Sequence, residues 1–194
     1  MVEKLITYDL FVQHILVDEI SKRPETDATI QKLVLQPDMT NREENYLRRE
    51  LLKKFNGAVG DAVHANPKEC VQRQLTYDEF LEIEWCPKGK ASSDYADHMS
   101  NHTRKLKAIL AFLKDPRLIK KLEPLAQKEV EKELPQFFKP WIPEKDKKHR
   151  RIYIFEFNGR KVIIDGCHRT GSILAALAKD AQYEPVDCSI AKFS

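Results

Sequence analysis

The sequence has no hydrophobic run of the length that a membrane-spanning helix needs, which is about 18 or more consecutive apolar residues. Cysteine is scarce: the chain has 4 among 194 residues, widely spaced and without a Cys-x-x-Cys pair. This pattern argues against a disulfide framework and against a structural zinc site. The net charge is only +3, and a charge this small does not by itself indicate binding to nucleic acid.

The first residues, Met1 to Leu5, also lack the basic segment, apolar run and small-residue cleavage site of a secretory signal. We therefore expect a cytoplasmic protein that does not span a membrane. With 42% hydrophobic residues in a chain of this length, the protein can bury a hydrophobic core without disulfides or structural metal.

A β-hairpin is predicted around Asn158-Gly159, which separates two apolar runs at residues 152–157 and 162–164. The Asn-Gly pair readily adopts the positive φ angles of a type I′ turn. Both alternating sets of side chains in residues 152–157 are apolar. This strand should therefore lie centrally in a sheet, with helices on both faces.

A tight turn at Asp165-Gly166 follows the hairpin, and residues 167–172 then begin a helix. The first N–H groups of a helix have no intrahelical partner and carry about half a positive charge, so they attract phosphate. His168 and Arg169 add cationic side chains in a turn where acidic residues are usual. The combination indicates a site for an anion.

Two hydroxyl-bearing residues of the same helix, Thr170 and Ser172, would add donors, and Gly171 would let a ligand approach the backbone. The alternative is an ordinary strand-to-helix turn in which Arg169 pairs with a nearby carboxylate. The basic residues 145–151, just before the hairpin, would either contact the outer phosphates of a nucleotide or nucleic acid, or form a solvated linker.

The motif Asp165-Gly166-Cys167-His168-Arg169, followed by a helix of small residues, resembles the signature of the ParB/sulfiredoxin superfamily. In that superfamily a hairpin leads into such a turn and helix, and the chain then returns as a strand, for which residues 184–190 are suited. The resemblance covers about the last quarter of the chain. Members include sulfiredoxins, which use ATP, ParB partition proteins, which bind CTP, and small-molecule kinases, all with a nucleotide phosphate at this turn.

Applied to this chain, the resemblance implies that the phosphates of ATP or another NTP are held by Gly166, Cys167, His168 and Arg169. Asp165 would be a general base or would hold Mg²⁺, or would only form the turn. Cys167 matches the reactive cysteine of sulfiredoxin, and a helix N-terminus beside Arg169 favours a thiolate. Asp165 stands where sulfiredoxin has glycine, however, and the long N-terminal portion is unrelated, which argues against repair of sulfinic acid.

The order Gly166-x-x-Arg169-Thr170-Gly171 also resembles the phosphate loop of tyrosine phosphatases. The nucleophilic cysteine of those enzymes would fall at Ile163, whose aliphatic side chain cannot attack phosphorus. Cys167 lies too far round the loop to replace it. On this alternative the protein is a catalytically inactive, phosphate-binding interaction protein.

Ahead of the hairpin the sequence is mainly helical. A helix is predicted over residues 40–55, with Thr40-x-x-Glu43 as its capping box. Another follows residue 101, and Asp115-Pro116 begins a third. Residues 5–20 are apolar at mixed spacing and would form either helix or strand.

Three further sequence patterns lie ahead of the hairpin. Residues 81–85 alternate apolar and polar, which predicts a strand. Residues 135–143 contain aromatics between prolines and predict an extended connector. Asp94, His98 and His102 would share one face of a helix and could together hold zinc, the plainer alternative being a surface helix start.

The sequence therefore predicts an α/β protein with residues 1–140 as a mainly helical portion. Residues 141–194 would carry a small mixed sheet of ParB/sulfiredoxin-like type, with hairpin, phosphate-binding turn, helix and return strand. The leading hypothesis is an ATP- or CTP-dependent phosphoryl-transfer or NTP-hydrolysing enzyme that uses Mg²⁺ and acts on a small molecule or a protein. The alternatives are a ParB-like nucleic-acid-associated module without catalysis and the phosphate-sensing interaction protein.

Overall fold

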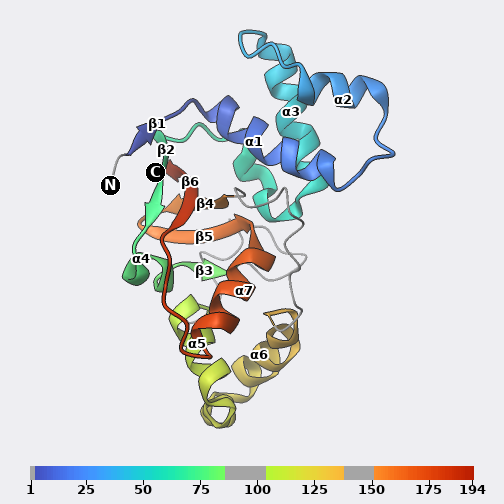
Figure 1. Cartoon of the computed structure of the whole chain (residues 1–194). Coiled ribbons are helices and arrows are strands. Elements are labelled where there is room, and N and C mark those ends of the chain that lie inside the picture. The colour runs from blue at the N-terminus through green and yellow to red at the C-terminus, as the bar shows by residue number, and fades with distance from the viewer. Residues whose placement is uncertain (1–2, 86–103, 138–150) are drawn as a thin grey trace.

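The computed structural model describes residues 3–85, 104–137 and 151–194. They form a mixed α/β fold around a six-stranded sheet with strand order β1-β2-β6-β4-β5-β3 (Figure 1). Strand β4 runs parallel to β6 and β3 runs parallel to β5, whereas the other neighbours are antiparallel. The strands are β1 (Lys4–Leu5), β2 (Glu69–Leu75), β3 (Glu84–Trp85), β4 (Ile152–Phe157), β5 (Arg160–Asp165) and β6 (Val186–Phe193).

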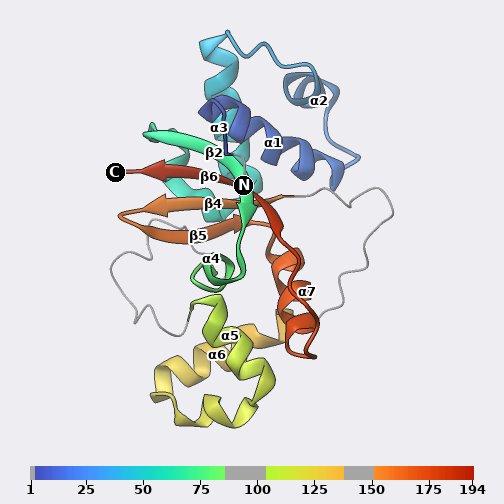
Figure 2. The same ribbon diagram turned by 60° about the vertical axis from the view of Figure 1, so that its left-hand side comes forward.

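Helices cover both faces of this sheet (Figures 1 and 2). The helices of the first half are α1 (Tyr8–Ser21), α2 (Ala28–Leu35), α3 (Arg42–Phe55), the 3-10 segment η1 (Gly57–His64) and α4 (Tyr77–Leu81). Those of the second half are α5 (Leu106–Lys114), the 3-10 segment η3 (Pro116–Lys121), α6 (Pro124–Phe137) and α7 (Cys167–Leu177). None of the helices in the described ranges is long and apolar enough to cross a membrane.

The predicted hairpin is confirmed. Asn158 and Gly159 have φ angles of 49° and 78° and join β4 to β5. Strand β4 lies between β5 and β6, and its successive side chains enter opposite cores: Ile154 packs with α5 and α7, and Phe155 packs with α1. The Phe155 ring stacks on Phe11 with centroids 5.9 Å apart. Burial on both faces explains the continuous apolar run of this strand.

The sheet is larger than the small C-terminal sheet expected from the sequence. Strand β2, from the N-terminal portion, pairs with β6 along seven residues from Glu69 to Leu75, and β1 and β3 form the two edges. The expected division at residue 140 therefore separates strands of the same sheet. The sequence pattern of β2 includes Gln72, Arg73 and Gln74, so it carried little strand signal.

Two N-terminal helices, α1 and α3, can be compared with the sequence predictions. Of residues 5–20, for which the sequence allows helix or strand, Leu5 ends β1 and residues 8–20 lie in α1. Helix α3 begins two residues later than predicted, because Asn41 is its cap: Asn41 Oδ1 accepts the N–H groups of Glu43 and Glu44 at 3.0 and 3.2 Å. The predicted capping box at Thr40 is wrong, since the Thr40 hydroxyl donates to Asp38 Oδ1 at 2.7 Å instead.

Two other predictions for this portion are wrong in extent. Residues 77–81 form α4, fixed by a capping box between Thr76 and Glu79, so only Glu84–Trp85 remain as strand. Helix α6 continues through Pro135 to Phe137, where a connector was expected. Pro135 lies in the last turn of α6, so it removes a hydrogen bond near the helix end rather than in its middle. Asp115 and Pro116 do begin a helix, η3, as predicted.

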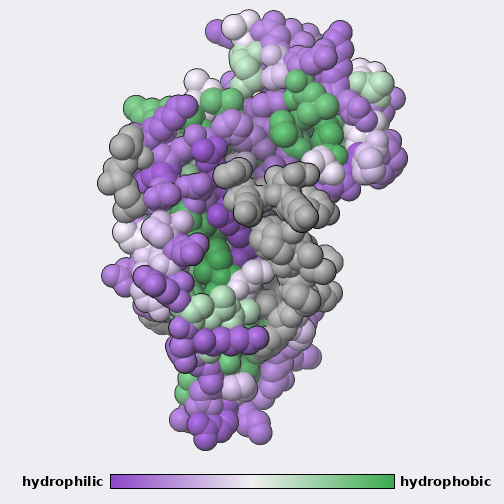
Figure 3. Space-filling view, viewed as in Figure 1, coloured by the Kyte–Doolittle hydropathy of each residue, from purple (hydrophilic) through white to green (hydrophobic). Residues whose placement is uncertain are grey.

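The positions 94, 98 and 102 of the predicted zinc face lie outside the described residues, as do residues 145–150 of the basic run. Elsewhere the surface is mainly hydrophilic in the view of Figure 3, with an apolar area over α2 and α3. These two helices carry the exposed Leu35 and Leu47.

The cap of α3 gives a direct test of the observed boundary. Replacing Asn41 by alanine removes the acceptor for two first-turn N–H groups, so Asn41→Ala should lower the free energy of unfolding by about 1 kcal/mol. Thr40→Ala should change it by no more than about 0.5 kcal/mol, because this exposed hydroxyl does not cap the helix. Urea unfolding of both variants measures the difference, and a larger loss for Thr40→Ala would contradict the assignment.

Candidate functional site

The turn between β5 and α7 depends on glycine. Gly166 has φ 94° and ψ 15°, in the left-handed region that side chains rarely adopt. A Cβ atom built at this residue would lie 3.2 Å from the Cα of Ile152 and 3.4 Å from the carbonyl oxygen of Arg151. The turn is therefore packed directly against the start of β4, and this contact fixes the position where α7 begins.

The N-terminus of α7 has no side-chain cap among the described residues. Cys167 and His168, the first two residues of the helix, are exposed. The N–H of Gly166 donates to Asp165 Oδ1 at 2.8 Å, and the N–H of Thr170 donates to the Gly166 carbonyl at 3.0 Å. The beginning of the helix, with its partial positive charge, therefore faces outward beside two cation-forming side chains, His168 and Arg169.

Arg169 is partly buried beside the start of β6. Burial lowers the pKa of Arg169, while the charges of Asp187 and Tyr183 oppose that shift. Its Nη1 atom is buried and has no hydrogen-bond partner among the described residues. The alternative in which Arg169 forms a close ion pair is not found in the described part of the chain, where Asp187 acts on it only at longer range.

The two predicted hydroxyl donors both donate to backbone carbonyls of the chain itself. Thr170 is fully buried and its hydroxyl donates to the Gly166 carbonyl at 3.1 Å. The hydroxyl of Ser172 donates to the His168 carbonyl at the same distance. Serine and threonine inside helices commonly bond the carbonyl four residues earlier. The structure therefore brings together Asp165, Gly166, Cys167, His168 and Arg169 at the turn, with the hydroxyls of Thr170 and Ser172 directed back into the helix.

Asp165 is held by the N-terminal portion of the chain as well as by the turn. Its Oδ1 atom lies 3.7 Å from Lys22 Nζ, at the end of α1. The adjacent Ile164 carbonyl accepts a hydrogen bond of 2.8 Å from Asn56, at the end of α3. Sequence reasoning missed Lys22 and Asn56, because they are more than a hundred residues from the motif and nothing in their local pattern signals the contact.

A row of polar side chains leads across the sheet to Asp165. Backbone pairing places Gln72, Ser189, Tyr153 and Asp165 opposite one another on β2, β6, β4 and β5. Above this row, His14 of α1 lies 3.1 Å from the Gln72 amide, and burial lowers the His14 pKa, helped by Arg151 and Lys4. In the sequence the members of this row are isolated polar residues without a motif.

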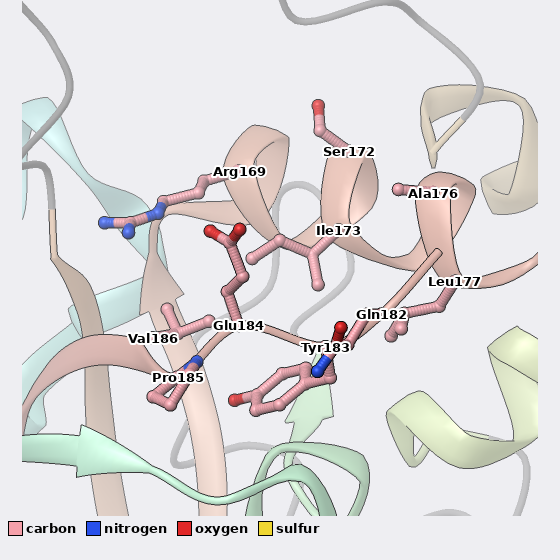
Figure 4. A pocket seen from close by; sticks show the side chains of 10 residues that line it. All are labelled: Arg169, Ser172, Ile173, Ala176, Leu177, Gln182, Tyr183, Glu184, Pro185 and Val186. Atoms are coloured by element: carbon pink, nitrogen blue, oxygen red, sulfur yellow. The ribbon is translucent and has the colours of Figure 1, made fainter. Parts of the chain in front are cut away.

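A pocket of about 460 Å³ lies beside Arg169, between α7 and the segment that leads into β6 (Figure 4). Helix α7 contributes Arg169, Ile173 and Leu177, and the opposite wall includes Tyr183 and Glu184. No sequence pattern signals this pocket, because its two walls are formed by the outer face of a helix and by a segment without regular structure.

No protein-family model, curated protein or solved structure matches this chain. Within the described ranges there is also no group of three or more His, Cys, Asp or Glu side chains that could hold a metal ion. Ile163, where a phosphatase would carry its cysteine, is fully buried in β5. The functional interpretation therefore depends on the geometry of the turn, Arg169 and the pocket.

The close contact of the Gly166 turn is testable with a matched pair of variants. Gly159 also has a positive φ, of 78°, but nothing lies within 4 Å of the position that a Cβ atom would take there. Gly159→Ala should therefore lower the free energy of unfolding by about 1–2 kcal/mol from backbone strain alone. Gly166→Ala should lower it by about 1–3 kcal/mol more, because its new methyl group also meets Ile152 and Arg151. Equal losses in urea unfolding would show that the turn is not packed against β4.

Proposed function

We propose that this chain is a nucleotide-dependent phosphoryl-transfer or NTP-hydrolysing enzyme of ParB/sulfiredoxin type, which holds the phosphate chain at the Asp165–Arg169 turn. The observation that carries the proposal is the buried Nη1 of Arg169, which lacks a partner among the described residues at the first turn of an uncapped helix. A buried donor without an acceptor costs about 1–3 kcal/mol. A phosphate oxygen would supply the missing acceptor.

The local charges support an anionic ligand of this kind. The guanidinium group of Arg169 can donate two parallel hydrogen bonds to one phosphate, a geometry that lysine does not offer. His168 lies exposed beside it, and the first N–H groups of α7 add their partial positive charge. All three contributions act at the same end of α7, so they reinforce one another at a single phosphate-binding point.

Asp165 is the candidate catalytic residue. It is only 18% exposed, and the Gly166 N–H and Lys22 keep its carboxylate at the edge of the turn. In the proposed reaction this carboxylate accepts the proton of the attacking hydroxyl group or water. The attacking oxygen forms a bond to the γ-phosphorus while the bond from that phosphorus to the bridging oxygen breaks, and the nucleoside diphosphate leaves. Arg169 and the α7 amides stabilise the charge that develops on the phosphoryl oxygens. Cys167, exposed as the first residue of α7, is a candidate nucleophile.

Asp165 also fits a magnesium ion, provided that the nucleotide supplies most of the ligands. Magnesium commonly binds through one or two carboxylates together with substrate phosphates and water. Bound in that way, Mg²⁺ would neutralise charge on the phosphates of the nucleotide. Since no three-ligand cluster exists among the described residues, affinity for Mg²⁺ should depend on the presence of nucleotide.

Ligand-induced thermal stabilisation tests the binding role of Arg169. ATP, CTP and GTP with Mg²⁺ are each added to wild-type protein, Arg169→Ala and Arg117→Ala, the last being a surface control whose side chain is 87% exposed. We expect at least one nucleotide at 100 times its Kd to stabilise wild type and Arg117→Ala by about 2.7 kcal/mol. Arg169→Ala should lose most of that stabilisation relative to its own ligand-free Tm. Equal stabilisation of all three proteins would contradict the proposal.

The catalytic role of Asp165 is tested by Asp165→Asn, which keeps an oxygen to accept the Gly166 N–H. Release of inorganic phosphate, with and without acceptor substrates, should fall by a factor of about 10²–10⁴. The shift in Tm that nucleotide induces without Mg²⁺ should persist, because Arg169 and α7 are unchanged. Asp61→Asn, at an exposed ion pair far along the chain, is the control. Undiminished turnover in Asp165→Asn would exclude Asp165 as the base.

A further inference from the structure

The pocket extends along α7 from Arg169 toward Leu177. Arg169, Ile173, Ala176 and Leu177 lie on one face of the helix, at the spacing of neighbouring turns. From Arg169 to Ala176 the helix rises about 10 Å, which is close to the length of a nucleoside monophosphate. The pocket volume of about 460 Å³ also falls within the range of small-ligand sites.

The opposite wall presents an aromatic ring that is fixed in place. The Tyr183 hydroxyl donates to the Leu75 carbonyl at 3.0 Å. The ring contacts Tyr77 and Phe80, with centroid distances of 5.4 and 5.5 Å. A ring held from three directions loses little freedom when a ligand arrives, and aromatic rings offer a stacking surface to any nucleobase.

The charged and polar side chains are ordered along the pocket (Figure 4). Arg169 is at one end, the Glu184 side chain rises toward α7 beside it, and Gln182 and Leu177 lie toward the other end. A carboxylate repels phosphate and accepts hydrogen bonds from hydroxyl groups. Phosphates are therefore favoured at the Arg169 end, ribose hydroxyls at Glu184, and an uncharged ring between Ile173 and Tyr183.

We propose that this pocket binds the nucleoside of a ribonucleotide, with its base against Ile173 and Tyr183, its ribose at Glu184 and its phosphates extending past Arg169 to the start of α7. The inference rests on the proposed function and deepens it, because it assigns the nucleoside to a wall of α7 and not to the motif residues. Gln182, at the far end, would hydrogen-bond the edge of the base.

The test fills the pocket without disturbing the core. Ala176 is exposed and lines the pocket, so Ala176→Trp should block it, whereas Ala28→Trp places the same side chain at an exposed helix position elsewhere. Calorimetry compares inorganic tripolyphosphate with whichever of ATP, CTP and GTP stabilises the protein most. Wild type and Ala28→Trp should bind the nucleotide at least tenfold more tightly than tripolyphosphate. Ala176→Trp should bind the two about equally.

The outcomes separate the two proposals. If wild type binds tripolyphosphate and the nucleotide equally well, or if Ala176→Trp keeps the preference for nucleotide, the nucleoside is not in this pocket, while phosphate binding at the turn still stands. If wild type binds neither ligand, the proposed function fails, and this inference fails with it.

Glu184→Ala provides a second variant, which removes the acceptor at an exposed residue that does not support the core. Wild type should prefer the ribonucleotide over its 2′-deoxy form by at least threefold, and Glu184→Ala should lose this preference without losing affinity for tripolyphosphate. A preference that is absent from wild type, or that persists in Glu184→Ala, would overturn the assignment of Glu184 to the ribose.

Discussion

The site depends on one steric constraint, the contact of the Gly166 turn with the first residue of β4. Because Gly166 has a left-handed conformation and its missing Cβ leaves only 3.2 Å to Ile152, the chain can turn immediately after Asp165 and begin α7 there. This places His168 and Arg169 at the helix start and Asp165 at the strand end. The position of β4 in the centre of the sheet, buried on both faces, holds that geometry in place.

Helices of the N-terminal half of the chain also hold the strands beside the Gly166 turn in place. Helix α1 packs its Phe11 ring on Tyr153 and Phe155 and brings Lys22 to Asp165, and Asn56 at the end of α3 holds the carbonyl of Ile164. The turn is therefore fixed by elements from both halves of the sequence. This joint support is consistent with a site whose residues must keep their positions while a charged ligand binds and leaves.

The sequence was most informative where local chemistry decides the structure. Asn158-Gly159, the Gly166 turn, the start of α7 and the buried strand β4 were all predictable, since positive φ angles and continuous apolar runs have few alternatives. Contacts between distant parts of the sequence were not predictable. Strand β2 carries polar residues that hide its strand pattern, and Lys22 and Asn56 reach the site only through tertiary packing. The sequence also could not predict where the Thr170 and Ser172 hydroxyls point or that a pocket forms at Tyr183. Both features depend on how neighbouring elements pack.

The central claim is that phosphates bind at the N-terminus of α7 and at Arg169. Its most direct test is an NMR titration of ¹⁵N-labelled protein with a nucleoside triphosphate and Mg²⁺, following the backbone amides of residues 166–170 and the guanidinium of Arg169. We predict saturable changes in chemical shift that are largest at these groups and that follow one binding curve. Saturable shifts confined to other parts of the protein, with these resonances unmoved, would contradict it.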